Sequence, residues 1–142
     1  MTKFKSDTVV IDRSDKLVFA FLSDFNNFEK LMPPQISDWK SDGESCSFNI
    51  QNMATLGMRY DSKTPDNHIF IKSDGKVPFA FDLQCFIDAV DNDTCNTRLE
   101  FTAELNPMLV MMASKPLTNF INMLAVKLKE VCELNQYQAR PE

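Results

Sequence analysis

The sequence of 142 residues contains little of what most catalytic and phosphate-binding sites require. It has one histidine, His68, and three widely separated glycines, Gly43, Gly57 and Gly75. A loop that cradles a phosphate needs several glycines within a few residues, so this spacing excludes one. His68 stands beside Asn67 at the start of a short predicted strand, on its polar side, without the nearby partners that a triad or a metal site needs. We therefore expect no catalytic residue, no metal site and no cofactor.

A charge excess and a long apolar run are also missing. The net charge is -5, from 15 basic and 20 acidic residues, and the charges are spread evenly, so no basic stripe can neutralise the phosphates of a nucleic acid. The N-terminal residues lack the apolar region of a signal peptide. No run of about 18 apolar residues, the length that spans a bilayer, occurs. These features predict a cytoplasmic protein that does not bind nucleic acid and has no membrane span.

The four cysteines are far apart and form no Cys-x-x-Cys pair. A cytoplasmic protein keeps its thiols reduced, and reduced cysteines usually behave as small buried apolar residues. We favour this interpretation over a disulfide or a metal role for Cys46, Cys85, Cys95 and Cys132.

The N-terminal quarter predicts one strand and two short helices. Residues 4–11 alternate between β-branched and polar side chains, which indicates a strand at the edge of a sheet. Ser14 is a suitable N-cap for a helix whose apolar residues follow at helical spacing over 17–22. A second short helical stretch, over 25–31, must end before the two prolines at 33–34.

From Ile36 onward the apolar residues recur at every second position, which is typical of antiparallel strands covered on one face. The strongest pair of strands is 77–89 with 95–105, because the odd positions of both are apolar. If the odd residues of both strands face the same side, the numbers of two residues opposite each other must add up to an even number. A three-residue loop at 91–93 satisfies this condition. This register places Leu83 opposite Phe101, Phe81 opposite Ala103, and Phe79 opposite Leu105.

The last predicted element is a long helix over 107–134. Asn106 is a plausible N-cap, and Pro107 suits the first helical position, where a missing N–H costs nothing. Pro116 lies inside the helix and should kink it, leaving the carbonyl of Met112 without its helical partner. One stripe of the helix is apolar and should cover the sheet: Val110, Ala113, Leu117, Phe120, Ile121, Leu124, Leu128 and Val131.

These elements predict a single α+β domain over 1–142, with a curved antiparallel sheet of six or seven strands around the C-terminal helix and two short helices between strands one and two. This order, with the stretches Ser14–Phe19 and Leu22–Glu29, resembles the START-like or Bet v 1-like (SRPBCC) superfamily, which includes polyketide cyclase/dehydrase and lipid-transport proteins. The resemblance covers essentially the whole chain. It implies a helix-grip fold with a cavity for apolar ligands, and functions from lipid transfer to cyclisation.

The candidate site is the apolar surface between sheet and helix. It would bind an apolar, lipid-like or polyketide-like molecule in a monomer, with methionines beside Pro116 adapting to the ligand. The same side chains could instead simply fill the core. The predicted lining is Phe48, Met58, Tyr60, Phe79, Phe81, Leu83, Phe101, Met108, Met112, Leu117, Phe120, Ile121 and Leu124.

Two alternatives remain open. An enzyme of the cyclase/dehydratase kind would need an acid or base inside the cavity, but the carboxylates of the strand pair (Asp82, Asp88, Glu100 and Glu104) occupy even positions, on the face away from the helix. The inward polar residues are Tyr60 and Thr97, with Asn52 near a strand bend, so Tyr60 would be central. The other alternative is a protein-interaction module with a filled core, which would use the exposed Met123 and Val126.

Overall fold

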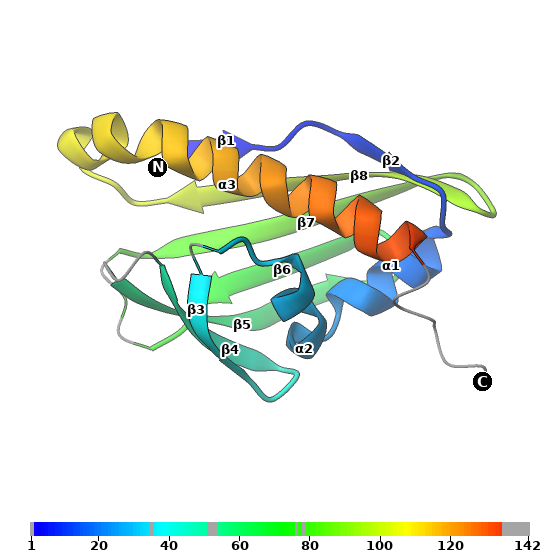
Figure 1. The fold of residues 1–142 in the computed structure, drawn as a ribbon, viewed down its shortest axis with the longest axis horizontal. Helices are drawn as coiled ribbons and strands as arrows, with labels where there is room; N and C mark the ends of the chain where they lie inside the picture. Colours follow the sequence, from blue (N-terminus) through cyan, green and yellow to red (C-terminus); the bar gives the residue numbers. More distant parts are fainter. Residues whose placement is uncertain (1, 35, 51–53, 76, 78, 135–142) are drawn as a thin grey trace.

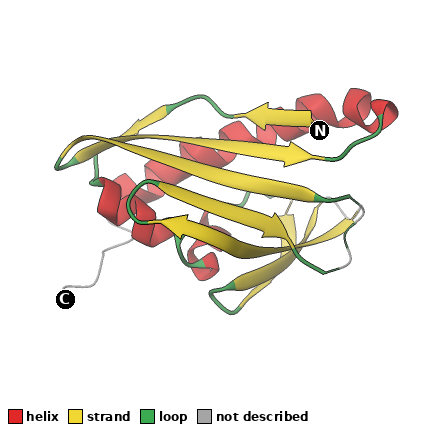
Figure 2. Cartoon of the chain, turned by 180° about the vertical axis from the view of Figure 1, so that it is seen from behind, coloured by secondary structure: helices red, strands yellow, loops and turns green. Residues whose placement is uncertain are grey.

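The computed structural model describes residues 2–34, 36–50, 54–75, 77 and 79–134. Within this part of the chain, eight strands form one antiparallel sheet in the order β1-β8-β7-β6-β5-β4-β3, and β2 also pairs with β8. The sheet curves around the long helix α3, as seen from one side in Figure 1 and from behind in Figure 2. The predicted α+β architecture is confirmed, with eight strands in the described residues in place of the six or seven expected. The strands are β1 (Thr2–Lys5), β2 (Val9–Ile11), β3 (Ile36–Ser41), β4 (Ser45–Ile50), β5 (Ala54–Thr64), β6 (His68–Ser73), β7 (Phe81–Asp91) and β8 (Thr94–Ala103); the helices are α1 (Asp15–Leu22), α2 (Phe25–Phe28), the short 3-10 helix η1 (Glu29–Leu31) and α3 (Pro107–Glu133).

The strand predicted over residues 4–11 is two strands, because the chain leaves the ladder at Ser6. Both pieces pair with β8, with Phe4 opposite Phe101 in β1 and Ile11 opposite Cys95 in β2. The Ser6 hydroxyl accepts a hydrogen bond of 2.9 Å from the Leu99 N–H and so replaces the missing backbone partner. The register shifts by one residue across this break. As a result, the even-numbered Phe4 and the odd-numbered Ile11 are both buried.

The two short helices form in the predicted stretches, and each begins at a capping side chain. Ser14 accepts a hydrogen bond of 3.1 Å from the Leu17 N–H and begins α1, and Asp24 accepts one of 2.8 Å from the Asn26 N–H and begins α2. Their buried residues include Phe21, which packs on the sheet at the end where α1 lies beside β6 and β7. One end of the concave face of the sheet is therefore filled by these helices.

The hairpin of β7 and β8 has the predicted register, with two corrections at its ends. Leu83 lies opposite Phe101, and Phe81 lies opposite Ala103. Phe79 is not paired with Leu105, because β7 begins only at Phe81 and β8 ends at Ala103. The turn has two residues, 92–93, rather than three. A bulge at Val90 shifts the register so that Asp91 pairs with Thr94, and the Asp91 carboxylate accepts a 2.8 Å hydrogen bond from the Asp93 N–H within this turn.

The two halves of α3 pack differently. Asn106 caps the helix by accepting a 2.9 Å hydrogen bond from the Leu109 N–H, and the helix continues through Pro116. No residue of the first half, 107–120, is buried. In the predicted apolar stripe, Val110, Ala113, Leu117 and Phe120 are only half-buried. The helix contacts β1, β2 and β8. All its buried residues lie in the second half: Ile121, Leu124, Ala125, Leu128, Val131 and Cys132.

By length and composition alone, α3 could cross a membrane, although the sequence shows no fully apolar run of that length. The same composition is found in helices that cover the core of a protein, and α3 holds this position over the sheet (Figure 1). The apolar face of the second half of the helix is thus explained by its packing on the sheet. The first half lies over the same sheet without a buried residue.

All four cysteines are buried and unpaired. Burial removes water from the thiolate, and this raises the pKa of Cys46, Cys85 and Cys132 to about 12. The same cause raises the pKa of Cys95. The native state holds these protons more tightly than the unfolded chain does. The contribution of the buried thiols to the free energy of unfolding is therefore complete below the ordinary thiol pKa near 9, and it is lost as the pH rises toward 12.

We expect the four thiols to resist alkylation in the native protein at mildly alkaline pH and to react quickly once the chain is unfolded in denaturant. Thiolate is the reactive form, and at that pH it is nearly absent from the folded state. Mass spectrometry of iodoacetamide-treated protein, native and unfolded, measures the number of labelled sites. Rapid labelling of Cys85 in the native protein would contradict this assignment.

Gly57 allows β5 to meet the end of β6 closely. The Asp74 N–H donates a 2.8 Å hydrogen bond to the Gly57 carbonyl. A Cβ at position 57 would lie 2.5 Å from the carbonyl oxygen of Asp74, a backbone atom that cannot move without displacing the strand. Since Leu56 and Met58 on either side are both buried, this contact fixes part of the inner face.

Replacing Gly57 with alanine should destabilise the protein by about 1–3 kcal/mol, the usual cost of overpacking a well-ordered site. Urea denaturation followed by circular dichroism measures the change in midpoint. The control is Thr55→Ala, which lies on the same strand with an exposed side chain and should change stability much less. Equal midpoints for the two variants would refute the close contact at Gly57.

Candidate functional site: an apolar cavity under the first half of helix α3

A cavity of about 620 Å³ lies between the first half of α3 and the sheet. Its walls come from four strands, from α3 and from the chain segments that flank these elements. The sheet side and the adjoining segments contribute Met32, Phe48, Ile50, Leu56, Met58, Phe79, Phe81, Leu83, Phe101 and Leu105; α3 contributes Leu109, Met112, Ala113, Lys115, Pro116, Leu117, Asn119, Phe120, Ile121, Met123 and Leu124.

The strand alternation places these side chains on one face. Leu83 and Phe101 are opposite each other in the β7–β8 ladder, and Phe81 stacks on Phe101 with ring centroids 5.2 Å apart and planes 25° apart. Phe79 extends the aromatic group beyond the end of β7, with its ring 6.0 Å from that of Phe81. On the far side of the cavity, Phe48 is held by Trp39 of the edge strand β3, whose ring stacks on it at 5.4 Å. Contacts with a neighbouring aromatic ring therefore hold these side chains in place on both sides of the cavity.

The structure brings all the predicted lining residues to this cavity except Tyr60 and Met108. The residues that it places there come from elements far apart in the sequence, from β4 to α3. The predicted residues that border the cavity are Phe48, Met58, Phe79, Phe81, Leu83, Phe101, Met112, Leu117, Phe120, Ile121 and Leu124. Whether they bind a ligand stays a prediction.

Tyr60 lies on the predicted face of the sheet but beneath the short helices rather than in the cavity. Its hydroxyl donates a 2.5 Å hydrogen bond to the carbonyl of Leu22, at the end of α1. Its ring stacks on Phe25 with centroids 4.1 Å apart, and the Lys63 ammonium lies 4.1 Å from the centre of the ring. Burial raises the pKa of Tyr60 well above its ordinary value. Tyr60 is therefore a structural contact between β5 and α1, and it is not placed to act on a molecule in the cavity.

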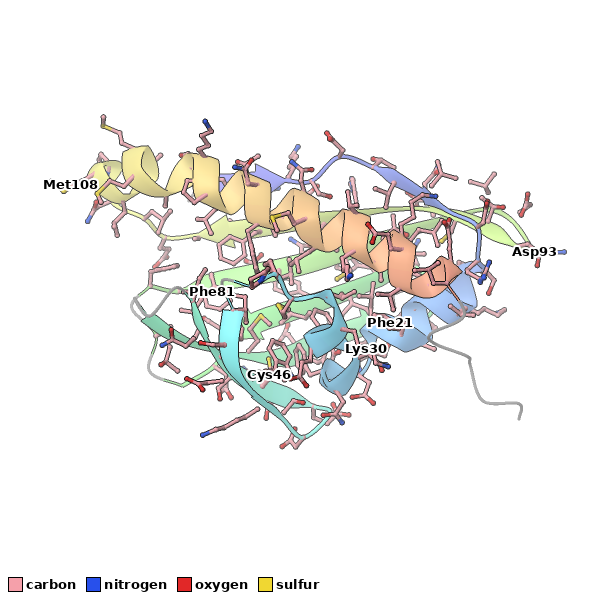
Figure 3. All side chains as sticks on the ribbon, viewed as in Figure 1. Phe21, Lys30, Cys46, Phe81, Asp93 and Met108 are labelled. Atoms are coloured by element: carbon pink, nitrogen blue, oxygen red, sulfur yellow. The ribbon has the colours of Figure 1, made fainter. Side chains whose placement is uncertain are left out.

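Met108 is also outside the lining. Its side chain is 70% exposed and Met111 is 85% exposed, because the first turn of α3 extends past the sheet. Figure 3 shows Met108 at the tip of the helix, whereas Phe81 lies inward, beneath the helix. Of the methionines predicted to close the pocket, Met112 borders the cavity.

Several lining residues were not predicted as such. Ile50, Leu56 and Leu105 continue the apolar alternation of their strands, so this signal could have found them. Lys115, Asn119 and Met123 lie outside the predicted apolar stripe of α3. Their place at the rim follows from the distance between helix and sheet, for which helical periodicity gives no signal.

The described lining contains one titratable side chain, Lys115, and therefore no acid–base pair. The carboxylates of the strand pair lie elsewhere: Glu100 is bound by Lys3 at 3.2 Å and by Arg98 at 3.5 Å in ion pairs outside the cavity. Thr97 is buried, with its hydroxyl 3.6 Å from the Cys95 sulfur, and does not border the cavity. Asn52 lies outside the described residues. No group of three or more metal-binding side chains occurs within the described residues.

An open groove of about 650 Å³ adjoins the cavity between η1 and the outer side of α3. Met32, Asn119 and Met123 line both the groove and the cavity, so these three residues mark where the cavity meets the surface. The remaining groove residues are Leu31, Pro33, Pro34, Asn122, Val126, Lys127 and Glu130. Val126 is half-exposed here, as the interaction-module alternative expected.

Solved structures of several proteins share the fold of this chain. A START superfamily protein from Mycobacterium smegmatis aligns with a TM-score of 0.67 at 13% identity, covering 91% of this chain and 98% of that one. The di-domain ARO/CYC protein BexL, from the BE-7585A biosynthetic pathway, aligns with a TM-score of 0.74 at 13% identity over 97% of this chain, which spans 48% of BexL. The chain has the START-like, Bet v 1-like helix-grip fold.

Norcoclaurine synthase from Thalictrum flavum, in complex with dopamine and hydroxybenzaldehyde, has the same fold, with a TM-score of 0.70 at 9% identity over 98% of this chain and 89% of that one. No family model matches the sequence, and no curated protein matches it. The resemblance predicted from the order of elements is confirmed for the fold. At these identities the likeness does not carry over an activity.

Tyr60→Phe should lower stability by about 1–2 kcal/mol, because it leaves the buried Leu22 carbonyl without its donor. It should leave the binding of an apolar dye unchanged, because Tyr60 does not border the cavity. Denaturant midpoint and dye titration measure the two effects separately. Weaker dye binding in a variant that remains fully folded would show that Tyr60 contacts the ligand after all.

Proposed function

We propose that this START-like protein binds a small apolar molecule in the cavity beneath α3 and acts as a carrier or sensor rather than as an enzyme. The observation that carries the proposal is a cavity of about 620 Å³ with an almost wholly apolar lining, under a half-helix that has no buried residue. The cavity volume falls within the roughly 300–1,000 Å³ that is usual for small-molecule sites.

Packing physics supports a ligand in this position. Protein interiors are packed about as densely as organic crystals, and their voids are few and small. The side chains around a large apolar void lack contact atoms on one side and lose dispersion attraction. Water is a poor substitute, because it needs polar partners that the walls of this cavity do not provide. An apolar molecule would restore the missing contacts, and each methylene that it buries would contribute about 0.8 kcal/mol.

The lining also combines rigid and adaptable parts. The aromatic residues of β7 and β8 are held by the sheet ladder and by ring stacking. The α3 side contributes Met112 and Met123, whose unbranched side chains can adjust to different shapes. The START-like fold, which binds hydrophobic ligands in other proteins, supports the same conclusion. The lack of an acid–base pair in the described lining favours binding over catalysis.

Filling the cavity with a side chain should remove binding. Ala113 borders the cavity from α3, so Ala113→Trp places an indole in the ligand space and should weaken the binding of an apolar fluorescent dye at least tenfold. The matched control is Met111→Trp, which adds the same ring two residues earlier at a position that is 85% exposed. Dye titration measures affinity, and circular dichroism checks that both variants fold.

The control variant should bind the dye as the unchanged protein does. If Ala113→Trp retains full affinity while folded, the dye binds outside the cavity and the proposal fails. If neither variant nor the unchanged protein binds apolar dyes or a panel of lipids, the cavity has no ligand-binding role.

A further inference from the structure

The polar part of the cavity lining is confined to one side of α3. Lys115 and Asn119 border the cavity among otherwise apolar residues, and both are exposed, so they stand at its rim. They are four residues apart and therefore neighbours on the helix surface. Among the described residues, no ion pair or hydrogen bond engages the Lys115 ammonium or the Asn119 amide. Both side chains are available to a ligand.

Pro116 adds a backbone acceptor to the same turn. A proline has no N–H, so the carbonyl of Met112, four residues earlier, has no helical donor. Met112 and Pro116 both border the cavity. The rim therefore offers an ammonium donor and an amide that donates and accepts, while the rest of the described lining offers apolar contacts.

We propose that the ligand is an acidic amphiphile, with its hydrocarbon part in the cavity and its carboxylate at the rim beside Lys115 and Asn119. This inference rests on the proposed function of the cavity. The carboxylate would accept hydrogen bonds from the Lys115 ammonium and the Asn119 amide, and the hydrocarbon would contact the aromatic wall of Phe79, Phe81 and Phe101.

Charge at the rim favours an anion over a cation or an uncharged head group. The described lining contains no carboxylate, and its one charged group is Lys115. An amine head group would meet that ammonium without a counter-charge. An anion would supply the missing partner, and the long stem of Lys115 lets its ammonium remain at the water boundary while it reaches the head group. The protein has a net charge of -5, so the attraction for an anion would come from this local positive group and not from the protein as a whole.

The test compares ligands that differ only in the head group: dodecanoic acid, 1-dodecanol and methyl dodecanoate, each measured by displacement of an apolar dye at neutral pH. We expect the acid to bind roughly fivefold more tightly than the alcohol or ester, the upper range for an exposed ion pair. Lys115→Gln should remove this preference, so that the acid binds no more tightly than the alcohol or the ester. Lys127→Gln is the matched control, since Lys127 lies on the same helix but outside the cavity lining.

The outcomes separate this inference from the proposed function. If the three ligands bind equally and Lys115→Gln changes nothing, the acidic head group is wrong while the apolar cavity site stands. If Lys127→Gln removes the preference as fully as Lys115→Gln does, the effect is one of overall charge, and the rim site is refuted. If the dye binds but none of the three ligands displaces it, the acidic amphiphile is wrong while the apolar site stands; if the dye itself does not bind, both proposals fail.

Discussion

The packing of the second half of α3 on the edge of the sheet determines the rest of the architecture. Leu124 and Leu128 are buried in this half, and polar contacts connect it to the segments on either side of β2. The Glu133 carboxylate accepts a 2.8 Å hydrogen bond from the Asp12 N–H, and the Asn122 amide oxygen accepts one of 2.8 Å from the Asp7 N–H. The helix continues through Pro116 as one element, whereas the sheet curves away beneath it (Figure 1). Fixing one half therefore holds the other half at a distance from the strands and leaves the cavity between them.

The concave face of the sheet is divided between two kinds of neighbour. At one end α1 and α2 fill it with their aromatic side chains, and Tyr60 connects the sheet to them through Phe25 and the Leu22 carbonyl. At the other end the first half of α3 stands over it, without a buried residue of its own. The same apolar strand face thus forms a dense core at one end and a cavity wall at the other. The difference lies in what covers each end and does not depend on the strand residues themselves.

This division explains what could be predicted from the sequence. Alternation along strands determines which face a side chain is on, so the pairing of Leu83 with Phe101 and most of the lining were predictable. Alternation does not say which covering element lies above a given residue. Tyr60 has the same parity as Met58 and faces the same side, yet it lies under α1 rather than in the cavity. Helical periodicity likewise identifies the stripe of α3 that faces the sheet but not where the sheet ends, and this is why Met108 was wrongly included and the rim position of Asn119 was missed.

The distribution of polar groups around the cavity also suggests how selectivity would arise. An apolar cavity discriminates weakly between similar hydrocarbons, because adding or removing one methylene group changes the affinity only modestly. Exposed polar groups at the rim add a preference among head groups, of the size expected for an exposed ion pair. In this protein the apolar walls come mostly from the sheet, and the polar groups come from one turn of α3 around Pro116. The strands would then determine the shape and hydrophobicity of the ligands that fit, whereas the choice among ligands of similar size would depend on this turn of the helix.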